Sequence, residues 1–288
     1  MKSVEIVYRY EARDASAAPR PKDADAARRR LNEGNRAFGA LLDGVTDEGG
    51  PARRVVEVDA RDLGLAPGDA ESAKQRPFAA IVGCSDARVP VELIFSEGPN
   101  DLFVVRVAGN VLGTEVLGSL KYAVEHLGGS LKVIAVLGHS GCGAVSAAVD
   151  VFLKPANYLP IATSHALRSI IDRLLVVVQA SAKAMADHLG PDVVQRPGYR
   201  GALIEVSVLM NAALAAHTIQ QELGDLDAHG LRAVYGAYLL DTRQIWAPRG
   251  AAAQSSGLAD PPGDLASFVE LGRAVVRSER ITSLLRAT

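Results

Sequence analysis

The chain has 288 residues, of which 48% are hydrophobic and 22% charged, and its formal net charge is -2. It is long enough to bury a sizeable core, so no metal is needed merely to hold the fold together. The near-neutral charge, with both signs mixed along the sequence, argues against a nucleic-acid partner and against binding to a membrane surface. No apolar run reaches the roughly 18 residues of a membrane span.

The first part of the chain is predicted to hold one helix between irregular segments. Residues 1–24 are charged throughout and lack the apolar segment of a secretory signal, so we expect a flexible arm and a cytoplasmic protein. A helix is predicted over residues 23–43, because Ala26, Leu31 and Phe38 fall near one face. Residues 44–75 are punctuated by glycine and proline and are expected to be loop-like.

From residue 78 onward, short apolar runs alternate with helical patterns. The predicted strands are 78–83, 102–107, 131–137 and 231–240, followed by a short antiparallel edge strand at 244–246. The predicted helices between them are 91–95, 115–127, 143–152, 164–188 and 201–223. Continuous Val, Ile and Leu runs between helices are typical of a parallel sheet covered on both faces. The predicted fold class is α/β, with a central, mostly parallel four-stranded sheet, a short antiparallel edge strand, helices on both faces and an N-terminal helical arm.

The last part of the chain is set apart by a linker of small residues over 250–263. Asp264 is suited to cap a helix over 265–276, and Ser278 to cap a last short helix. We therefore divide the chain into the arm (1–24), a main domain (25–248) and a C-terminal helical extension (249–288). The sequence does not indicate a role for this extension.

Both cysteines of the chain and one histidine lie where predicted strands end. Cys84 follows the strand at 78–83, His139 follows the strand at 131–137, and Cys142 comes shortly after in a glycine-rich turn. Because the carboxyl ends of parallel strands meet at one edge of a sheet, we expect these side chains to converge. Two thiolates and an imidazole supply three ligands of a tetrahedral zinc ion, and a catalytic zinc keeps its fourth position for water.

Two charged residues follow Cys84 at short spacing. Asp86 is placed to accept a hydrogen bond from water on the zinc. Two thiolates neutralise the charge of the ion, so this zinc acidifies its water less than a zinc held by neutral imidazoles, and a nearby carboxylate favours the hydroxide. Arg88 is placed to hold Asp86 ionised through a bidentate pair. Three other interpretations remain open. The cysteines can be ordinary core residues, Gly141 and Gly143 can cradle a phosphate, and Asp86 can close a purely structural zinc site as its fourth ligand.

The stretches Cys-Ser-Asp-Ala-Arg-Val-Pro (84–90) and Gly-His-Ser-Gly-Cys-Gly (138–143) resemble the two signature motifs of the β-class carbonic anhydrases. Weaker similarity extends over residues 25–246. The resemblance implies an enzyme that reversibly hydrates carbon dioxide to bicarbonate with one zinc ion per chain. The family's zinc ligands fall at Cys84, His139 and Cys142, and its catalytic pair falls at Asp86 and Arg88.

The resemblance also implies substrate-binding residues and an assembly. The residues that match the family's substrate pocket are Gln75, Phe103, Ala108 and Tyr122. The family implies a homodimer, or a larger even-numbered homo-oligomer, whose N-terminal helices cross onto the partner and whose active sites lie near the interface. One subgroup of the family has a second, inhibitory bicarbonate site and resembles a sequence pattern with Trp at the position that Ile81 occupies here. We therefore expect the open form of the zinc site in this chain, with water on the zinc and no such inhibitory site.

Two rival functions remain for such a chain. The first is hydrolysis of CS₂ or COS, which the same scaffold and the same zinc site can perform with a different access route. The second is a non-catalytic protein that binds zinc or bicarbonate, which the pairing of Asp86 with Arg88 argues against.

Overall fold

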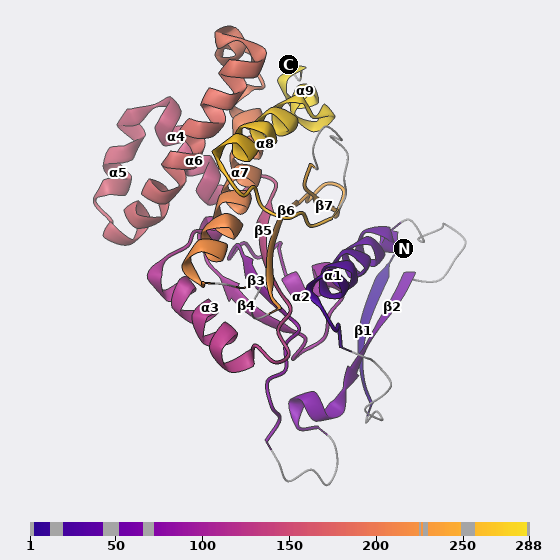
Figure 1. Cartoon of the computed structure of the whole chain (residues 1–288). Helices are drawn as coiled ribbons and strands as arrows, with labels where there is room; N and C mark the ends of the chain where they lie inside the picture. Colours follow the sequence, from indigo (N-terminus) through magenta and orange to yellow (C-terminus); the bar gives the residue numbers. More distant parts are fainter. Residues whose placement is uncertain are drawn as a thin grey trace.

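The computed structural model describes residues 3–11, 20–42, 52–65, 72–224, 226, 230–248 and 257–286 (Figure 1). Its centre is a five-stranded sheet with the order β4-β3-β5-β6-β7. The strands are β3 (Ala79–Gly83), β4 (Leu102–Arg106), β5 (Val133–His139), β6 (Arg232–Tyr238) and β7 (Ile245–Trp246). The first four in spatial order are parallel, and β7 runs antiparallel to β6. This confirms the predicted sheet, including its antiparallel edge strand.

Apolar side chains of the sheet belong to two separate hydrophobic cores, one on each face of the sheet. In β3, Ala80 and Val82 belong to the larger core, whereas Ala79 and Ile81 belong to the smaller one. This alternation follows from the two-residue period of a strand. Every residue of β3 and of β5 is buried. Strands whose residues are almost all apolar must be covered on both faces, and this is the arrangement that the structure shows.

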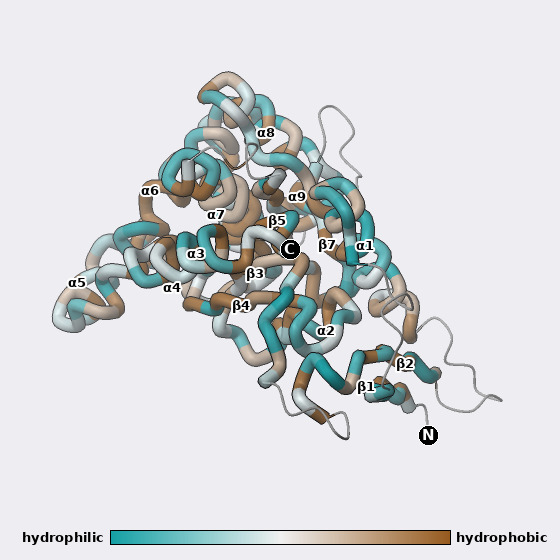
Figure 2. Tube along the Cα trace, turned by 60° about the horizontal axis from the view of Figure 1, so that its bottom comes forward, coloured by the Kyte–Doolittle hydropathy of each residue, from teal (hydrophilic) through white to brown (hydrophobic). Residues whose placement is uncertain are grey.

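Helices cover both faces of the sheet (Figure 1). Residues of α1 and α2 line the smaller core, and residues of α3, α4, α6, α7, α8 and α9 line the larger one. The helices are α1 (Ala24–Gly39), α2 (Val91–Phe95), α3 (Thr114–Leu127), α4 (Gly143–Leu153), α5 (Tyr158–Ala162), α6 (His165–Leu189), α7 (Tyr199–Glu222), α8 (Leu265–Arg277) and α9 (Glu279–Arg286). Figure 2 shows the hydrophobic segments gathered at the centre, around β3, β5 and α7. The predicted helices in these regions agree with the observed ones to within a few residues.

Among the residues that the structure describes, one helix, α7, is long and apolar enough to cross a membrane by length and composition. Its most apolar window is 78% buried inside the protein. It packs against β5, β6 and α6. This is the environment of a core helix, so its composition is explained by packing within the fold.

The N-terminal region differs from the sequence prediction, because it contains two strands. β1 (Val4–Glu11) and β2 (Ala52–Asp59) pair in parallel, and α1 lies between them in the chain. The predicted flexible arm and loop-like segment included no strand. Both strands carry several charged residues and only β2 has buried positions, so their pattern lacks the uninterrupted apolar signal of the central strands. Other parts of the two segments, 12–19, 43–51 and 66–71, lie outside the described residues.

The helix α1 is anchored on its own chain. Gly34 lies against the backbone of Phe95 at the end of α2. The Asn35 side-chain amide donates to the carbonyl oxygens of Ile94 (3.3 Å) and Arg243 (3.1 Å), and its oxygen accepts from the Ile245 N–H (2.8 Å). The crossing of this helix onto a partner, which the family resemblance implies, stays a prediction.

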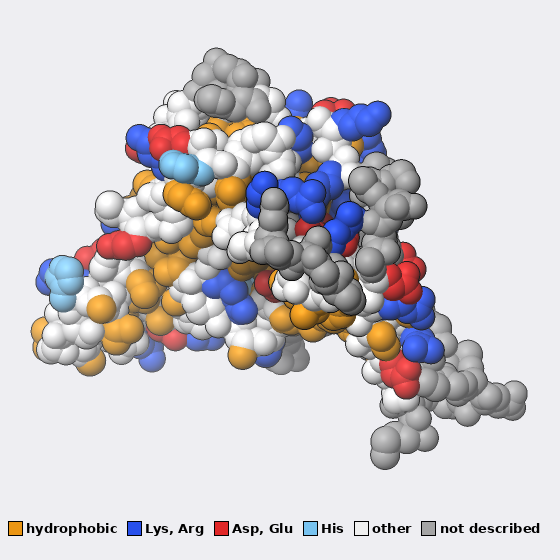
Figure 3. Space-filling view, turned by 90° about the horizontal axis from the view of Figure 1, so that it is seen from below, with side chains coloured by type: hydrophobic (Ala, Val, Ile, Leu, Met, Phe, Trp, Pro, Cys, Tyr) orange, Lys and Arg blue, Asp and Glu red, His pale blue; other side chains and the backbone are white. Residues whose placement is uncertain are grey.

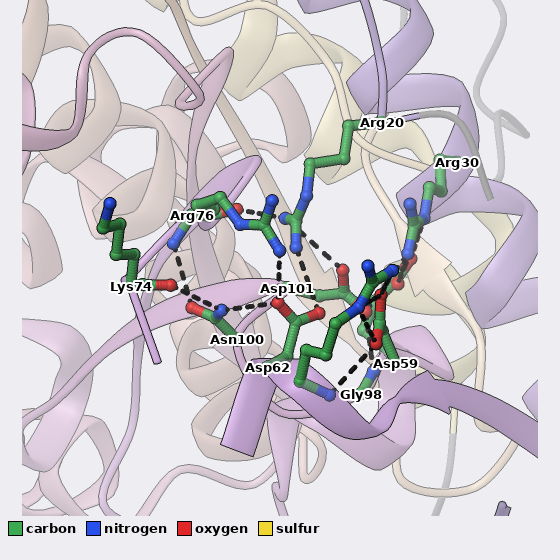
Figure 4. A network of polar contacts seen from close by, with 11 residues as sticks. Arg20, Arg30, Asp59, Asp62, Lys74, Arg76, Gly98, Asn100 and Asp101 are labelled. Carbon is green, nitrogen blue, oxygen red and sulfur yellow. Dashed lines mark hydrogen bonds and ion pairs between the residues drawn. The ribbon is translucent and has the colours of Figure 1, made fainter. Parts of the chain in front are cut away.

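A network of ion pairs joins the segment after β2 to the loop before β4 (Figure 4). Asp62 accepts from Arg76 (2.9 Å), from Asn100 (3.0 Å) and from Arg20 (3.3 Å). Asn100 also accepts from the Arg76 backbone N–H (2.9 Å). These contacts fix the polypeptide around residues 74–76 although it forms no helix or strand there.

The C-terminal extension is helical, as predicted, and it packs against the main domain. Asp264 accepts from the Ser267 N–H (2.8 Å) and caps α8. Ala259 exchanges two backbone hydrogen bonds with Tyr235 of β6 (2.8 and 2.9 Å), which extends the sheet edge beside β7. The helices α8 and α9 lie against α6 and α7. Residues 250–256 of the predicted linker lie outside the described residues, and residues 257–263 are described.

Candidate metal centre

Three buried side chains converge at the carboxyl edge of the sheet. Cys84 follows β3 directly, His139 is the last residue of β5, and Cys142 precedes α4. Gly83 is in register with Leu137, so Cys84 and His139 lie within one residue of the same level on neighbouring strands. The two sulfur atoms and the nearest histidine nitrogen all lie within 4.8 Å of one another. The predicted convergence is therefore present.

The donor atoms fit a tetrahedral zinc ion. The two sulfur atoms are 3.9 Å apart and unbonded. Two ligands about 2.3 Å from one zinc at the tetrahedral angle are separated by about 3.8 Å. Nδ1 of His139 is 3.1 Å from the Ser140 carbonyl oxygen, which can only accept, so Nδ1 carries the proton and Nε2 presents a lone pair. Nε2 is buried, and no hydrogen-bond partner for it is found within the part of the chain that is described. A zinc ion would satisfy this orphaned nitrogen.

The two thiols also interact with each other. A hydrogen bond between the two thiols lowers the pKa of Cys84 and raises the pKa of Cys142, because one proton is shared between two sulfur atoms. A metal held by Cys84 and Cys142 would require both sulfurs as thiolates, so its binding would release the remaining proton.

Asp86 lies beside these donors and is clamped by Arg88. The guanidinium donates to both carboxylate oxygens, from Nε to Oδ1 (3.0 Å) and from Nη2 to Oδ2 (2.7 Å), and the Arg88 backbone N–H donates to Oδ1 (2.9 Å). These hydrogen bonds hold the pKa of Asp86 well below its usual range. Oδ2 lies 3.8 Å from Nε2 of His139. The predicted bidentate pair of Asp86 and Arg88 is present, with both carboxylate oxygens engaged by the guanidinium.

Further side chains hold the backbone of this site in place. Arg106 donates from Nε to the Cys84 carbonyl (2.8 Å) and from Nη2 to the Asp86 carbonyl (2.5 Å). The Gly109 N–H points at the sulfur of Cys84 (3.3 Å), and Asn211 of α7 holds the Gly109 carbonyl (2.9 Å). The sequence contained one signal for Asn211, namely an amide within the long apolar run of α7. It contained no indication of which backbone group that amide would meet.

Comparison with known proteins identifies the family. A family model described as carbonic anhydrase matches residues 79–233, which is more than half of the chain. This chain belongs to the β-class carbonic anhydrase family. The matched segment contains all three candidate ligands together with Asp86 and Arg88. It excludes Gln75 and the C-terminal extension.

Several curated carbonic anhydrases align with part of the chain. Carbonic anhydrase 2 of Mycobacterium tuberculosis is 46% identical over 124 residues, which cover 43% of this chain and 52% of the relative. A carbonic anhydrase of Mycolicibacterium smegmatis is 41% identical over 113 residues, covering 38% of this chain and 50% of the relative. The chain therefore spans about half the length of the curated relatives it matches.

Solved β-carbonic anhydrases also resemble the structure. One from Sordaria macrospora, described as tetrameric, gives a TM-score of 0.47 at 21% identity and covers 60% of this chain and 81% of its own. The β-carbonic anhydrase CcaA gives a TM-score of 0.46 at 24% identity and covers 60% of this chain and 79% of its own.

The four residues that match the family's substrate pocket occupy different places. Ala108 begins a short turn (η3, Ala108–Asn110) and precedes Gly109, whose N–H points at the sulfur of Cys84. Tyr122 is 49% exposed on α3 and stacks on His126, with ring centroids 4.6 Å apart. Within one chain, the structure brings only Ala108 of the four next to the candidate ligands.

Gln75 and Phe103 share a pocket of about 300 Å³ whose lining includes none of the candidate ligands. Arg106 pairs with Gly83, so Phe103 lies roughly 13 Å along β4 from the level of Cys84, which is four residues at about 3.3 Å each. These two residues therefore lie together, toward the opposite end of the sheet from the metal centre of their own chain.

Proposed function

We propose that this protein catalyses the reversible hydration of carbon dioxide to bicarbonate and a proton, with one zinc ion held by Cys84, His139 and Cys142. The observation that carries the proposal is the convergence of these three buried donors beside the clamped carboxylate of Asp86. Membership of the family supports it, and the matching relatives are named carbonic anhydrases. The proposal extends to the whole chain from an alignment of about half the length of those relatives.

The roles of the chain's own groups follow from their positions. When bound here, zinc supplies a Lewis acid that lowers the pKa of a water molecule. The thiolates of Cys84 and Cys142 compensate the charge of the ion, and the hydrogen bond from Nδ1 of His139 to the Ser140 carbonyl fixes the ring. Asp86 accepts a hydrogen bond from the reacting water and orients it toward the substrate. Arg88 is a positioning residue, because it keeps Asp86 ionised and fixed.

The substrate side of the site needs apolar walls, because carbon dioxide carries no net charge. We propose that Ala108 supplies one such wall, because it directly precedes Gly109, whose N–H points at the sulfur of Cys84. Bicarbonate then needs polar donors, and the family resemblance assigns this role to Gln75. Gln75 and Phe103 lie away from the metal centre of their own chain, so we propose that they complete the site of a partner in a homodimer.

Exposed apolar surface supports such an assembly. Large hydrophobic side chains are exposed on α5 and α6, including Leu159 (74%), Leu167 (56%) and Val176 (63%). Figure 3 shows hydrophobic side chains in a band across the face seen from below. Contiguous apolar surface of this kind is typical of contacts between chains. We also propose a cytoplasmic location, since thiolate ligands persist best in a reducing compartment.

Metal analysis combined with a carbon dioxide hydration assay tests the proposed function. We expect one zinc ion per chain and a hydration rate that rises between about pH 6.5 and about pH 9, as the water loses its proton. Zinc without hydration activity at any of these pH values contradicts the proposal and supports a binding protein. Sulfide release from CS₂ or COS without hydration of carbon dioxide replaces it with the hydrolase alternative.

A further inference from the structure

The turn between His139 and Cys142 is held by a carboxylate from α7. The Gly141 N–H donates to Oε1 of Glu205 at 2.9 Å. On the other side, the Ser140 N–H donates to the Tyr238 carbonyl, also at 2.9 Å. Glu205 thus fixes the backbone midway between two of the candidate metal ligands.

The second oxygen of Glu205 is held in turn by the C-terminal helix α9. Arg280 approaches Oε2 of Glu205 with Nε (3.0 Å) and with Nη2 (2.9 Å). Its Nη1 donates to Oδ2 of Asp241 at 2.9 Å, and Asp241 follows β6. The Glu205 and Arg280 side chains are only 11% and 22% exposed, so water competes weakly for this pair. One guanidinium therefore ties α9 to α7 and to the turn after β6.

The helix α9 is itself fixed on α7. Ile281 and Leu285 are buried, with 0% and 4% of their surface exposed, and Ser278 before them is buried as well. A Cβ atom added to Gly198, just before α7, would lie 1.9 Å from the carbonyl oxygen of Leu284. Real Cβ atoms do not approach backbone so closely, so the two segments touch directly. A displacement of α9 would therefore be felt at α7.

We propose that α9 is a support of the metal centre, and that Glu205 and Arg280 are positioning residues of the turn between His139 and Cys142. Arg280 acts through Glu205, whose carboxylate it holds against the Gly141 N–H. A turn held in its liganding conformation before the metal arrives loses less conformational freedom on binding, so affinity rises. The inference rests on the metal binding in the proposed function. It gives a role to a segment outside the residues 79–233 that match the family.

Zinc affinity of the full-length chain, measured by competition with a chromophoric chelator, tests this support. Loss of a group that orients metal ligands typically lowers affinity by about 10- to 100-fold. We expect a loss in this range for Glu205→Ala and a smaller loss for Arg280→Met, in which the carboxylate remains but is no longer held. The double variant should bind zinc no more weakly than Glu205→Ala, because Arg280 acts only through Glu205.

Matched variants separate positioning from general stability. Arg286→Met removes an exposed arginine of the same helix and should keep wild-type affinity. Glu205→Gln keeps an oxygen that can accept from Gly141 and should retain more affinity than Glu205→Ala. The absorption bands of the cobalt(II)-substituted protein should shift in Glu205→Ala and not in Arg286→Met. All measurements are made well below the thermal unfolding transition of each variant.

Three results overturn the inference alone, namely wild-type zinc affinity in both Glu205→Ala and Arg280→Met, full additivity of the two losses, and an equal loss in Arg286→Met. A wild-type chain that binds no zinc overturns the proposed function together with the inference. Wild-type zinc binding with weakened Glu205 and Arg280 variants supports the inference even if the chain hydrates no carbon dioxide.

Discussion

The carboxylate of Asp86 lies 3.8 Å from Nε2 of His139 and has both oxygens engaged by Arg88. We expect Asp86→Asn to retain zinc, because none of the three candidate ligands changes. Its kcat/KM for hydration should fall by about 10- to 100-fold, since the neutral amide accepts a weaker hydrogen bond from the reacting water and loses the charge-assisted pair with Arg88 that holds the side chain in place. Stopped-flow assays with metal analysis of the same sample measure both quantities. Unchanged hydration in this variant would remove Asp86 from the mechanism.

The ion pair of Asp86 and Arg88 should also affect the stability of the protein in acid. Arg88 holds the pKa of Asp86 below its usual value, so the unfolded chain binds this proton at a higher pH than the folded chain. The resulting stabilisation is fully present above about pH 4 and is lost as the pH falls through the folded pKa. Arg88→Met should lower the free energy of unfolding at neutral pH and flatten its acid dependence. Urea unfolding of the wild type and of Arg88→Met from neutral to acid pH measures the free energy of unfolding and its pH dependence. Identical pH profiles for these two proteins contradict the prediction.

At the scale of elements, the contact between α1 and α2 depends on a glycine. A Cβ atom at Gly34 would lie 1.7 Å from the Phe95 carbonyl oxygen, so a side chain there forces the two helices apart. We expect Gly34→Ala to lower the free energy of unfolding by at least about 1–3 kcal/mol, the usual range for overpacking.

Gly118→Ala is the matched control for this substitution. Gly118 lies on the exposed side of α3, and an added Cβ meets no atom within 4 Å. Alanine there should be neutral or stabilise the helix by up to about 1 kcal/mol. Denaturant midpoints of Gly34→Ala and Gly118→Ala measure the difference in stability between the two variants. Equal midpoints would show that α1 and α2 can separate without cost.

The predictability of the elements depended on how their strands are covered. β3 and β5 are buried on both faces and carry uninterrupted apolar runs, so their positions were readable from the sequence. β1 is mostly exposed and β2 is mostly half-buried. Both strands carry charges and are separated in the chain by the whole of α1, so no local sequence pattern indicated them. A parallel pairing between distant segments is decided by tertiary contacts, not by neighbouring residues.

At the scale of the whole molecule, the positions of Gln75 and Phe103 predict a homodimer with shared sites. Sedimentation equilibrium of the wild-type chain should give a dimer or a larger even-numbered assembly. We expect Gln75→Ala and Asp86→Asn to be impaired separately and to recover activity when mixed by subunit exchange. In a mixed dimer, the intact Asp86 of one chain would meet the intact Gln75 of the other.

The same mixing experiment can contradict shared sites. If Gln75 served the metal centre of its own chain, a mixed dimer would contain no intact site and activity would not recover. Mixing Asp86→Asn with Cys84→Ser is the matched control. Each of these changes damages the metal centre of its own chain, so a mixed dimer contains no intact site under either model.

The sequence by itself determined the central α/β layer order and the convergence of Cys84, His139 and Cys142. Apolar periodicity places strands locally, and parallel strands must end at a common edge. It also determined the pairing of Asp86 with Arg88, because two residues of separation suffice for that contact. Only the tertiary structure decided which distant groups brace the site, as when Glu205 meets Gly141 and Arg280 meets Glu205. The reason is physical, since a polar side chain can reach many backbone groups and the packing of α7 and α9 selects one of them.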